Sequence, residues 1–306
     1  MISILDVGCR YGVYQLFSDN FEKFDYVAVD IDEDEIIRLK RKYNDKNIRF
    51  FSKFLGAEQK KISFKFSKHK GYGSSKAINR NSVWFGLIRA DETEIVETRE
   101  FLAEKSSVFM SKYVYNNSIV KLDVEGGELD FLRGLDDKSF EHIEAFVIEA
   151  HFDTPYETDS NFYSIGKFLK DKNYWAGSIQ VEGGQVNKFY EEKDTLPLVS
   201  NVIFIKDSYK PTNYSLRPKK LEIMCEVLYA LKLDALLLHL LSTTSTSSIK
   251  QHRLFNEIKF VIGHKLNRLI KKPFVEKEEI ELLYSKIFDE EFPTLSDFYE
   301  SEFFNP

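Results

Sequence analysis

The sequence is poor in the residues that mark several classes of protein. Its 306 residues include only two cysteines, Cys9 and Cys225, which are too few for a disulfide framework and favour a reducing compartment. Glycine and proline number 14 and 7, and with 43% hydrophobic residues this composition excludes a fibrous or disordered chain. The net charge is -6, so no overall basic field attracts nucleic acid or anionic lipid.

The chain also lacks a segment typical of export or membrane insertion. Residues 2–6 already have the pattern of a strand, and no basic or apolar leader precedes them. The most apolar stretch, residues 227–241, is interrupted by Lys232 and Asp234 and is shorter than the ~20 residues of a membrane-spanning helix. We therefore expect a cytoplasmic protein without a transmembrane segment.

Short apolar runs alternate with helical patterns over about the first 206 residues. This alternation predicts an α/β fold with a mostly parallel sheet that is covered by helices on both faces. The last two strands are close enough to pair antiparallel, and residues 62–66 have the pattern of an added strand at a sheet edge. We expect strands at residues 2–5, 26–29, 48–55, 62–66, 118–122, 143–148, 174–179 and 202–205, and helices or amphipathic segments at residues 11–17, 34–43, 125–132 and 162–169.

Beyond Pro218 the pattern is entirely helical. It predicts a long helix at residues 221–241, a Ser/Thr-rich linker, a basic segment at 249–270 and an acidic one at 276–288. We therefore divide the chain into residues 1–210 and a C-terminal helical annex, 211–306. The basic segment could contact a membrane surface or an anionic polymer, but we expect it to pair with the acidic stretch from Glu276 to Glu302 or to form a homo-oligomer.

The loop after the first expected strand reads Asp6-Val7-Gly8-Cys9-Arg10-Tyr11-Gly12. Glycines allow a backbone to approach a ligand, and the helix expected next offers free N–H groups. Three residues separate the glycines, so the loop differs from a dinucleotide fingerprint and suits a ligand without phosphates; an ordinary turn is the alternative. Asp30 ends the second strand, where a carboxylate can bind ribose hydroxyls. Capping of the next helix is the other interpretation of Asp30, and Asp32 is the second candidate for ribose.

Residues 121–128, Lys-Leu-Asp-Val-Glu-Gly-Gly-Glu, resemble the Lys-Ile-Asp-Val-Glu-Gly-x-Glu hallmark of FkbM-type methyltransferases, a class I, Rossmann-like family that depends on S-adenosylmethionine. The Asp6–Gly12 loop resembles the cofactor loop of class I methyltransferases. Residues 73–75 resemble the family's Ser-Ser loop, and residues 146–151 its fifth-strand ending. The resemblance covers about residues 1–206 and implies a seven-stranded sheet with an antiparallel last strand. Two positions depart from the family: Cys9-Arg10-Tyr11 replaces Ala-Asn and a small residue, and Asp30 replaces Glu.

The resemblance also implies roles for individual residues. Methyl transfer to a hydroxyl needs in-line alignment and a proton acceptor. The expected catalytic residues are His151 as the base, with Asp123, Glu125 and Glu149; stabilisation of a helix start is the alternative for Glu125. Asp123, Glu149 and His151 could also hold a divalent metal, which the spacing does not require. S-adenosylmethionine would be bound by Asp6, Gly8, Arg10, Gly12, Asp30 and Leu55, with Phe54 beside Leu55 near the adenine.

The function expected from this resemblance is O-methylation of a sugar hydroxyl, on a nucleotide-activated sugar or a surface polysaccharide or capsule precursor. The alternatives are another small metabolite or lipid-linked acceptor, and a non-catalytic binding module that retains the fold. A dehydrogenase is disfavoured by the glycine spacing, and nucleic acid by the lack of an Asn/Asp-Pro-Pro-aromatic motif. Residues 68–85, which include Trp84, are long and polar enough to form a lid that contacts a sugar.

Overall fold

The computed structural model describes residues 1–84, 92–114, 117–184, 196–211, 218–244, 249–272 and 275–292. The chain divides into two compact units, Met1–Asp207 and Ser208–Pro306, and each is described by itself. Within the described ranges, no helix is both long and apolar enough to cross a membrane.

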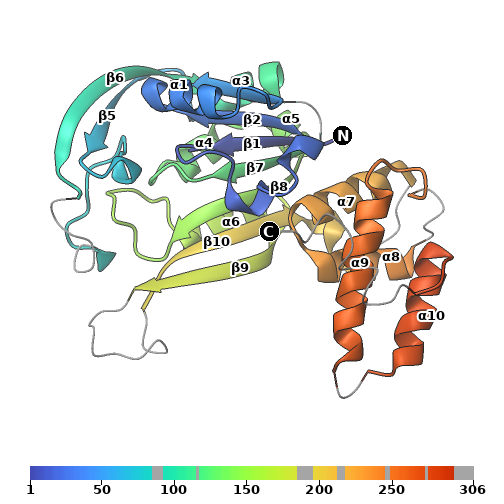
Figure 1. The fold of residues 1–306 in the computed structure, drawn as a ribbon. Helices are drawn as coiled ribbons and strands as arrows, with labels where there is room; N and C mark the ends of the chain where they lie inside the picture. The colour runs from blue at the N-terminus through green and yellow to red at the C-terminus, as the bar shows by residue number, and fades with distance from the viewer. Residues whose placement is uncertain are drawn as a thin grey trace. The chain divides into compact units, whose positions relative to one another are not determined.

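A seven-stranded sheet forms the centre of the first unit (Figure 1). The strand order is β3-β2-β1-β7-β8-β10-β9. The strand β10 runs antiparallel to its neighbours β8 and β9, and the other pairs are parallel. This confirms the predicted α/β fold with its antiparallel last strand. The strands are β1 (Ser3–Val7), β2 (Asp25–Asp30), β3 (Ile48–Ser52), β7 (Ser118–Leu122), β8 (Ile143–His151), β9 (Tyr174–Gly184) and β10 (Leu196–Lys206).

The central strands lie deepest in this unit, because every residue of β1 and β7 is buried. Helices α1 (Glu33–Lys42), α3 (Ser106–Tyr113), α4 (Glu128–Arg133), α5 (Asp137–His142) and α6 (Phe162–Asp171) contribute apolar side chains to the core. Helix α1 begins where the carboxylate of Asp32 accepts hydrogen bonds from the N–H groups of Asp34 and Glu35, a typical N-cap. This cap directly follows the end of β2 and so fixes the chain beside Asp30.

The prediction of a helix after the first loop is wrong. The chain forms only short 3-10 turns at Gln15–Phe17 and Phe21–Lys23. The N–H groups here bond to side chains from later in the sequence: that of Val13 donates to the Tyr43 hydroxyl at 3.4 Å, and that of Tyr14 to the Tyr26 hydroxyl at 3.3 Å. The loop therefore lacks a following helix N-terminus.

The predicted edge strand at residues 62–66 is present, but at the edge of a second sheet and not of the main one. It lies in a separate three-stranded sheet of order β4-β6-β5, formed by β4 (Phe54–Gly56), β5 (Lys61–Ser67) and β6 (Ile95–Lys105). The expected strand at 48–55 is divided between β3 in the main sheet and β4 in this second one. Phe64 and Phe66 of β5 pack in an apolar cluster with Ile31, which joins the second sheet to the end of β2.

The second unit is helical, as expected. The long helix expected at 221–241 is instead two helices, α7 (Pro218–Ala230) and α8 (Asp234–Thr243), because Lys232 adopts a left-handed conformation with φ of 53°. The later helices are α9 (Phe255–Ile270) and α10 (Lys277–Phe288). Ion pairs join Lys250 to Asp289 at 3.4 Å and Lys259 to Glu290 at 2.7 Å, so the basic segment pairs with the acidic one inside this unit.

Candidate functional site

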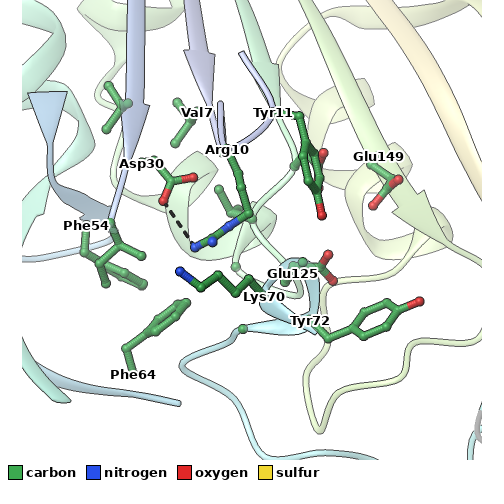
Figure 2. A pocket seen from close by; sticks show the side chains of 18 of the residues that line it. Val7, Arg10, Tyr11, Asp30, Phe54, Phe64, Lys70, Tyr72, Glu125 and Glu149 are labelled. Carbon is green, nitrogen blue, oxygen red and sulfur yellow. Dashed lines mark ion pairs between the residues drawn. The ribbon is translucent and has the colours of Figure 1, made fainter. Parts of the chain in front are cut away.

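A cavity of about 330 Å³ lies at the carboxyl ends of the central strands of the first unit (Figure 2). Its wall includes Val7 at the end of β1, Asp30 at the end of β2, Asp123 just after β7 and Glu149 in β8. Leu55 and Phe54 of β4 form another part of the wall. Ligands of open α/β sheets bind at this edge, where the strand order reverses between β1 and β7.

The two glycines of the first loop differ in position. Gly8 lines the cavity and has φ of +83°, and a Cβ atom there would lie 1.8 Å from the carbonyl oxygen of Asp123. Glycine is therefore required at Gly8 by the neighbouring turn of the protein itself. Gly12 has φ of +109° and packs against the Tyr43 hydroxyl, and it is not part of the cavity wall.

Arg10 and Asp30 face each other across one end of the cavity (Figure 2). The Arg10 Nη2 atom lies 3.7 Å from the Asp30 carboxylate and 3.2 Å from that of Asp32. Burial raises the pKa of Asp30, while the N–H of Asp32, which donates to it at 2.9 Å, and the charge of Arg10 lower that pKa. This carboxylate thus has both a cation and a backbone donor.

Asp6 lies below the cavity wall and is fully buried. It accepts a hydrogen bond from the Tyr26 hydroxyl at 2.7 Å and forms an ion pair with Lys121 at 3.2 Å. The Lys121 ammonium also donates to the Gly8 carbonyl at 3.0 Å and lies 3.4 Å from Asp123. Although burial lowers the pKa of Lys121, Asp6 and Asp123 together raise it above its ordinary value. Lys121 therefore acts as a buried cation that connects the first loop to the turn after β7, a role the sequence interpretation missed.

Three carboxyl groups form an acidic cluster at the other end of the cavity: Asp123, Glu125 and Glu149. One oxygen of each lies within 4.8 Å of the others. Burial and Asp123 raise the pKa of Glu149 to about 9, and burial, Asp123 and Glu149 raise that of Glu125 well above its ordinary value. The oxygens could hold a divalent cation, and the set contains Glu125 where the sequence interpretation had His151.

His151 does not line the cavity. Its ring is buried with its centroid 5.5 Å from that of Trp84, which does line it. Burial lowers the pKa of His151 to about 4, so the imidazole is neutral near pH 7. The role of His151 as the base stays a prediction, and the groups that reach the cavity are those of the acidic cluster.

The segment expected to act as a lid contributes part of the cavity wall. Tyr72 and Gly73 line the cavity, and a Cβ atom on Gly71 would lie 2.8 Å from the Tyr11 hydroxyl. The first loop and this segment therefore approach each other closely at the cavity. The lid interpretation extends to residue 85, which lies outside the described residues.

Tyr156 and Ser74 also belong to the site. The sequence interpretation gave Tyr156 no role and placed Ser74 only in the segment expected to contact a sugar. The Tyr156 hydroxyl donates to the Glu125 carboxyl at 2.7 Å, and the Ser74 hydroxyl donates to the Glu125 carbonyl at 2.7 Å. The Ser-Ser resemblance was a signal for Ser74. Nothing in the sequence pattern pointed to Tyr156.

A family model described as the methyltransferase FkbM domain matches residues 6–175, more than half of the chain. No curated protein sequence matches.

Solved structures are similar at low identity. An S-adenosylmethionine-dependent methyltransferase from Agrobacterium tumefaciens shares 12% identity over 67% of this chain and 56% of its own, with a TM-score of 0.33. M. jannaschii TYW2, solved in complex with AdoMet, shares 12% over 67% and 69%, with a TM-score of 0.30. The 16S rRNA methylase ArmA shares 16% over 67% and 74%, with a TM-score of 0.28. Likenesses at this level carry no information on the substrate.

Proposed function

Because the chain belongs to the FkbM methyltransferase family, we propose that it transfers a methyl group from S-adenosylmethionine to a sugar hydroxyl. The acceptor would be a nucleotide-activated sugar or a precursor of a surface polysaccharide. One observation carries this proposal: the cavity has the Asp30 carboxylate, paired with Arg10, at one end and the acidic cluster at the other. We name these the cofactor end and the acceptor end.

At the cofactor end, Asp30 would accept hydrogen bonds from the two ribose hydroxyls. Arg10 already lies beside this carboxylate, so the ribose would share Asp30 with the guanidinium. Phe54 and Leu55 offer an apolar wall for the adenine, and the backbone around Gly8 would approach the methionine part. This donor and acceptor set fits S-adenosylmethionine, which supplies an electrophilic methyl group when bound.

At the acceptor end, the acidic cluster would receive the proton of the attacking hydroxyl. The acceptor oxygen forms a bond to the methyl carbon as the carbon–sulfur bond breaks, and the hydroxyl proton moves to a carboxylate oxygen. The raised pKa of Glu149 makes its ionised form a stronger base than an ordinary carboxylate, but near neutral pH this group is mostly protonated. The proton would therefore move to whichever carboxyl group of the acidic cluster is ionised when the acceptor binds. Trp84 and Tyr72 in the wall offer aromatic faces to a sugar ring.

The test has two steps. Isothermal titration with S-adenosylmethionine should show binding, and nucleotide sugars incubated with enzyme and cofactor should gain one methyl group by mass spectrometry. Absence of cofactor binding would overturn the enzyme function in favour of a binding module. Transfer to a small metabolite or lipid-linked acceptor, but to no sugar, would replace the proposed substrate class. Parallel reactions with a chelator decide whether the acidic cluster needs a divalent cation.

A further inference from the structure

The turn after β7 adopts a backbone conformation that side chains disfavour. Glu125 has φ of 51° and Gly126 has φ of 88°, both in the left-handed region. The buried carboxylate of Glu128 accepts hydrogen bonds from the N–H groups of Val124 at 3.2 Å and Gly126 at 3.3 Å. The Ser160 hydroxyl donates to the same carboxylate at 2.6 Å. Specific contacts therefore hold the turn in a form that places Glu125 in the cavity wall.

Two further groups from distant parts of the chain hold Glu125 itself. The Ser74 hydroxyl fixes its main-chain carbonyl. The Tyr156 hydroxyl donates to Oε2 of its carboxyl at 2.7 Å and lies 3.4 Å from the carbonyl oxygen of Tyr72. Tyr156 is only 2% exposed, and its ring packs on Gly126, where a Cβ atom would lie 3.1 Å from the ring. The phenol is therefore aimed at one carboxyl oxygen with little freedom to move.

Tyr156 belongs to residues 153–157, which pair with residues 70–84, the segment that contributes part of the cavity wall. Antiparallel bridging joins Ile78 to Tyr156, so the position of the phenol depends on how residues 70–84 lie. Further contacts between the two segments include backbone hydrogen bonds from the Asn79 N–H to the Pro155 carbonyl (2.8 Å) and from the Glu157 N–H to the Ala77 carbonyl (2.7 Å). The Asp153 carboxylate also accepts hydrogen bonds from the Ser82 hydroxyl (2.9 Å) and the Val83 N–H (2.6 Å).

We propose that Tyr156 is a positioning residue for methyl transfer, whose hydroxyl holds the Glu125 carboxyl at the acceptor end against the neighbouring carboxylates. The inference rests on the proposed function, because a fixed carboxyl matters for catalysis only if an acceptor hydroxyl binds beside it. Asp123 and Glu149 repel the ionised form of Glu125, and Glu128 adds to this repulsion. The phenol opposes that repulsion by donating to the ionised carboxyl, which lowers its pKa.

The substitution Tyr156→Phe removes only the hydroxyl. We expect kcat to fall about tenfold, the scale of one hydrogen bond to a charged group, with the Kd for S-adenosylmethionine unchanged. The rising limb of the kcat–pH profile should shift to higher pH, because Glu125 then ionises less readily. In a Glu125→Gln background the same substitution should have no further effect on kcat. The matched control is Tyr174→Phe, another buried tyrosine, whose hydroxyl donates to the Phe140 and Ile143 carbonyls.

A second measurement separates this inference from the proposed function. NMR titration of side-chain carboxyl carbons, in ligand-free protein labelled at glutamate, should show a higher pKa for Glu125 in Tyr156→Phe than in the wild type. An unchanged pKa, or an equal loss of kcat in both backgrounds, would overturn the positioning role even if sugars are methylated. A wild-type protein that methylates no sugar would overturn the proposed function, and the titration still tests the hold of Tyr156 on Glu125.

Discussion

The two ends of the cavity hold the same chemical group in opposite surroundings. At the cofactor end, the Asp30 carboxylate has Arg10 at 3.7 Å and a backbone N–H at 2.9 Å, and both lower its pKa, although burial keeps that pKa above its ordinary value. At the acceptor end, Glu125 and Glu149 have each other and Asp123 as neighbours, so repulsion adds to burial.

This difference teaches how one fold can assign carboxyl groups to different tasks. A carboxylate with donors around it remains an acceptor of hydrogen bonds, which suits ribose hydroxyls. Crowded carboxyl groups hold protons to higher pH, which suits proton exchange with a reacting hydroxyl. The following substitutions change first the cofactor end, then the acceptor end, and last a residue that does not line the cavity.

Removal of the cofactor-end carboxylate should have the largest effect. Asp30→Ala deletes the acceptor for the ribose, and we expect the Kd for S-adenosylmethionine to rise about 10- to 100-fold by isothermal titration, since hydrogen bonds to a charged group are lost. Turnover at saturating cofactor should change much less. Asp137→Ala, at an exposed residue paired with Lys172, is the control. An unchanged Kd would remove Asp30 from the cofactor site.

Removal of the Arg10 cation should leave Asp30 without its positive neighbour, so that its pKa becomes more like those of the acceptor-end carboxyl groups. In Arg10→Gln, burial of Asp30 is no longer offset by the guanidinium, so its pKa should rise further. The loss of affinity for S-adenosylmethionine on acidification should then begin at a higher pH than in the wild type, by about one pH unit for each unit by which the pKa rises. Arg133→Gln, at an exposed residue paired with Asp159, should follow the wild type. Loss of affinity at the same pH in Arg10→Gln and wild type would contradict this account.

Relief of the repulsion at the acceptor end should stabilise the fold. Glu149 has a folded pKa of about 9 against an ordinary 4.5, so the folded state binds a proton that the unfolded chain releases. The contribution of Glu149 to the stability of the fold is therefore fully present below about pH 4.5 and is lost as the pH rises to about 9. Glu149→Gln should raise Tm by about 2–4 °C at pH 8 and leave it unchanged at pH 4.5. The exposed Glu141→Gln serves as the control, and an equal gain at both pH values would point to packing instead.

The smallest effect on activity is expected at His151, which does not line the cavity. His151→Gln should change kcat less than about twofold, well below the loss typical of a missing general base. The folded pKa of His151 is about 4 against 6.5, so its contribution is present above pH 6.5 and lost as the pH falls to 4. The variant should therefore be less acid-sensitive in thermal unfolding. A hundredfold loss of kcat with unchanged Tm would restore His151 as the base.

The sequence predicted those parts of the site that depend on where strands end. Asp30, Asp123 and Glu149 each lie at or near the carboxyl end of a parallel strand, and their strands were recognisable from apolar runs. How far the cavity extends along a strand was not predictable in this way, because residues two apart in a strand lie on the same face of the sheet. His151 and Glu149 are two residues apart in β8, yet only Glu149 lines the cavity.

Other parts of the fold depend on contacts between distant residues. The chain after the first loop forms short 3-10 turns instead of the expected helix, and its Val13 and Tyr14 N–H groups donate to the distant hydroxyls of Tyr43 and Tyr26. The strand β6 carries mixed charges and is largely exposed, so its pairing with β5 left no apolar pattern to detect. Tyr156 likewise reaches Glu125 across 31 positions of sequence.

The contact between Gly8 and Asp123 limits how this site can be transplanted. The backbone of the turn after β7 fills the space in which a side chain on Gly8 would lie, and Lys121 binds the Gly8 carbonyl from the same strand. The first loop and the segment from Lys121 to the turn after β7 are therefore structurally dependent on each other. A chimera that exchanges the first loop with that of another methyltransferase must carry the Lys121–Glu128 segment along with it.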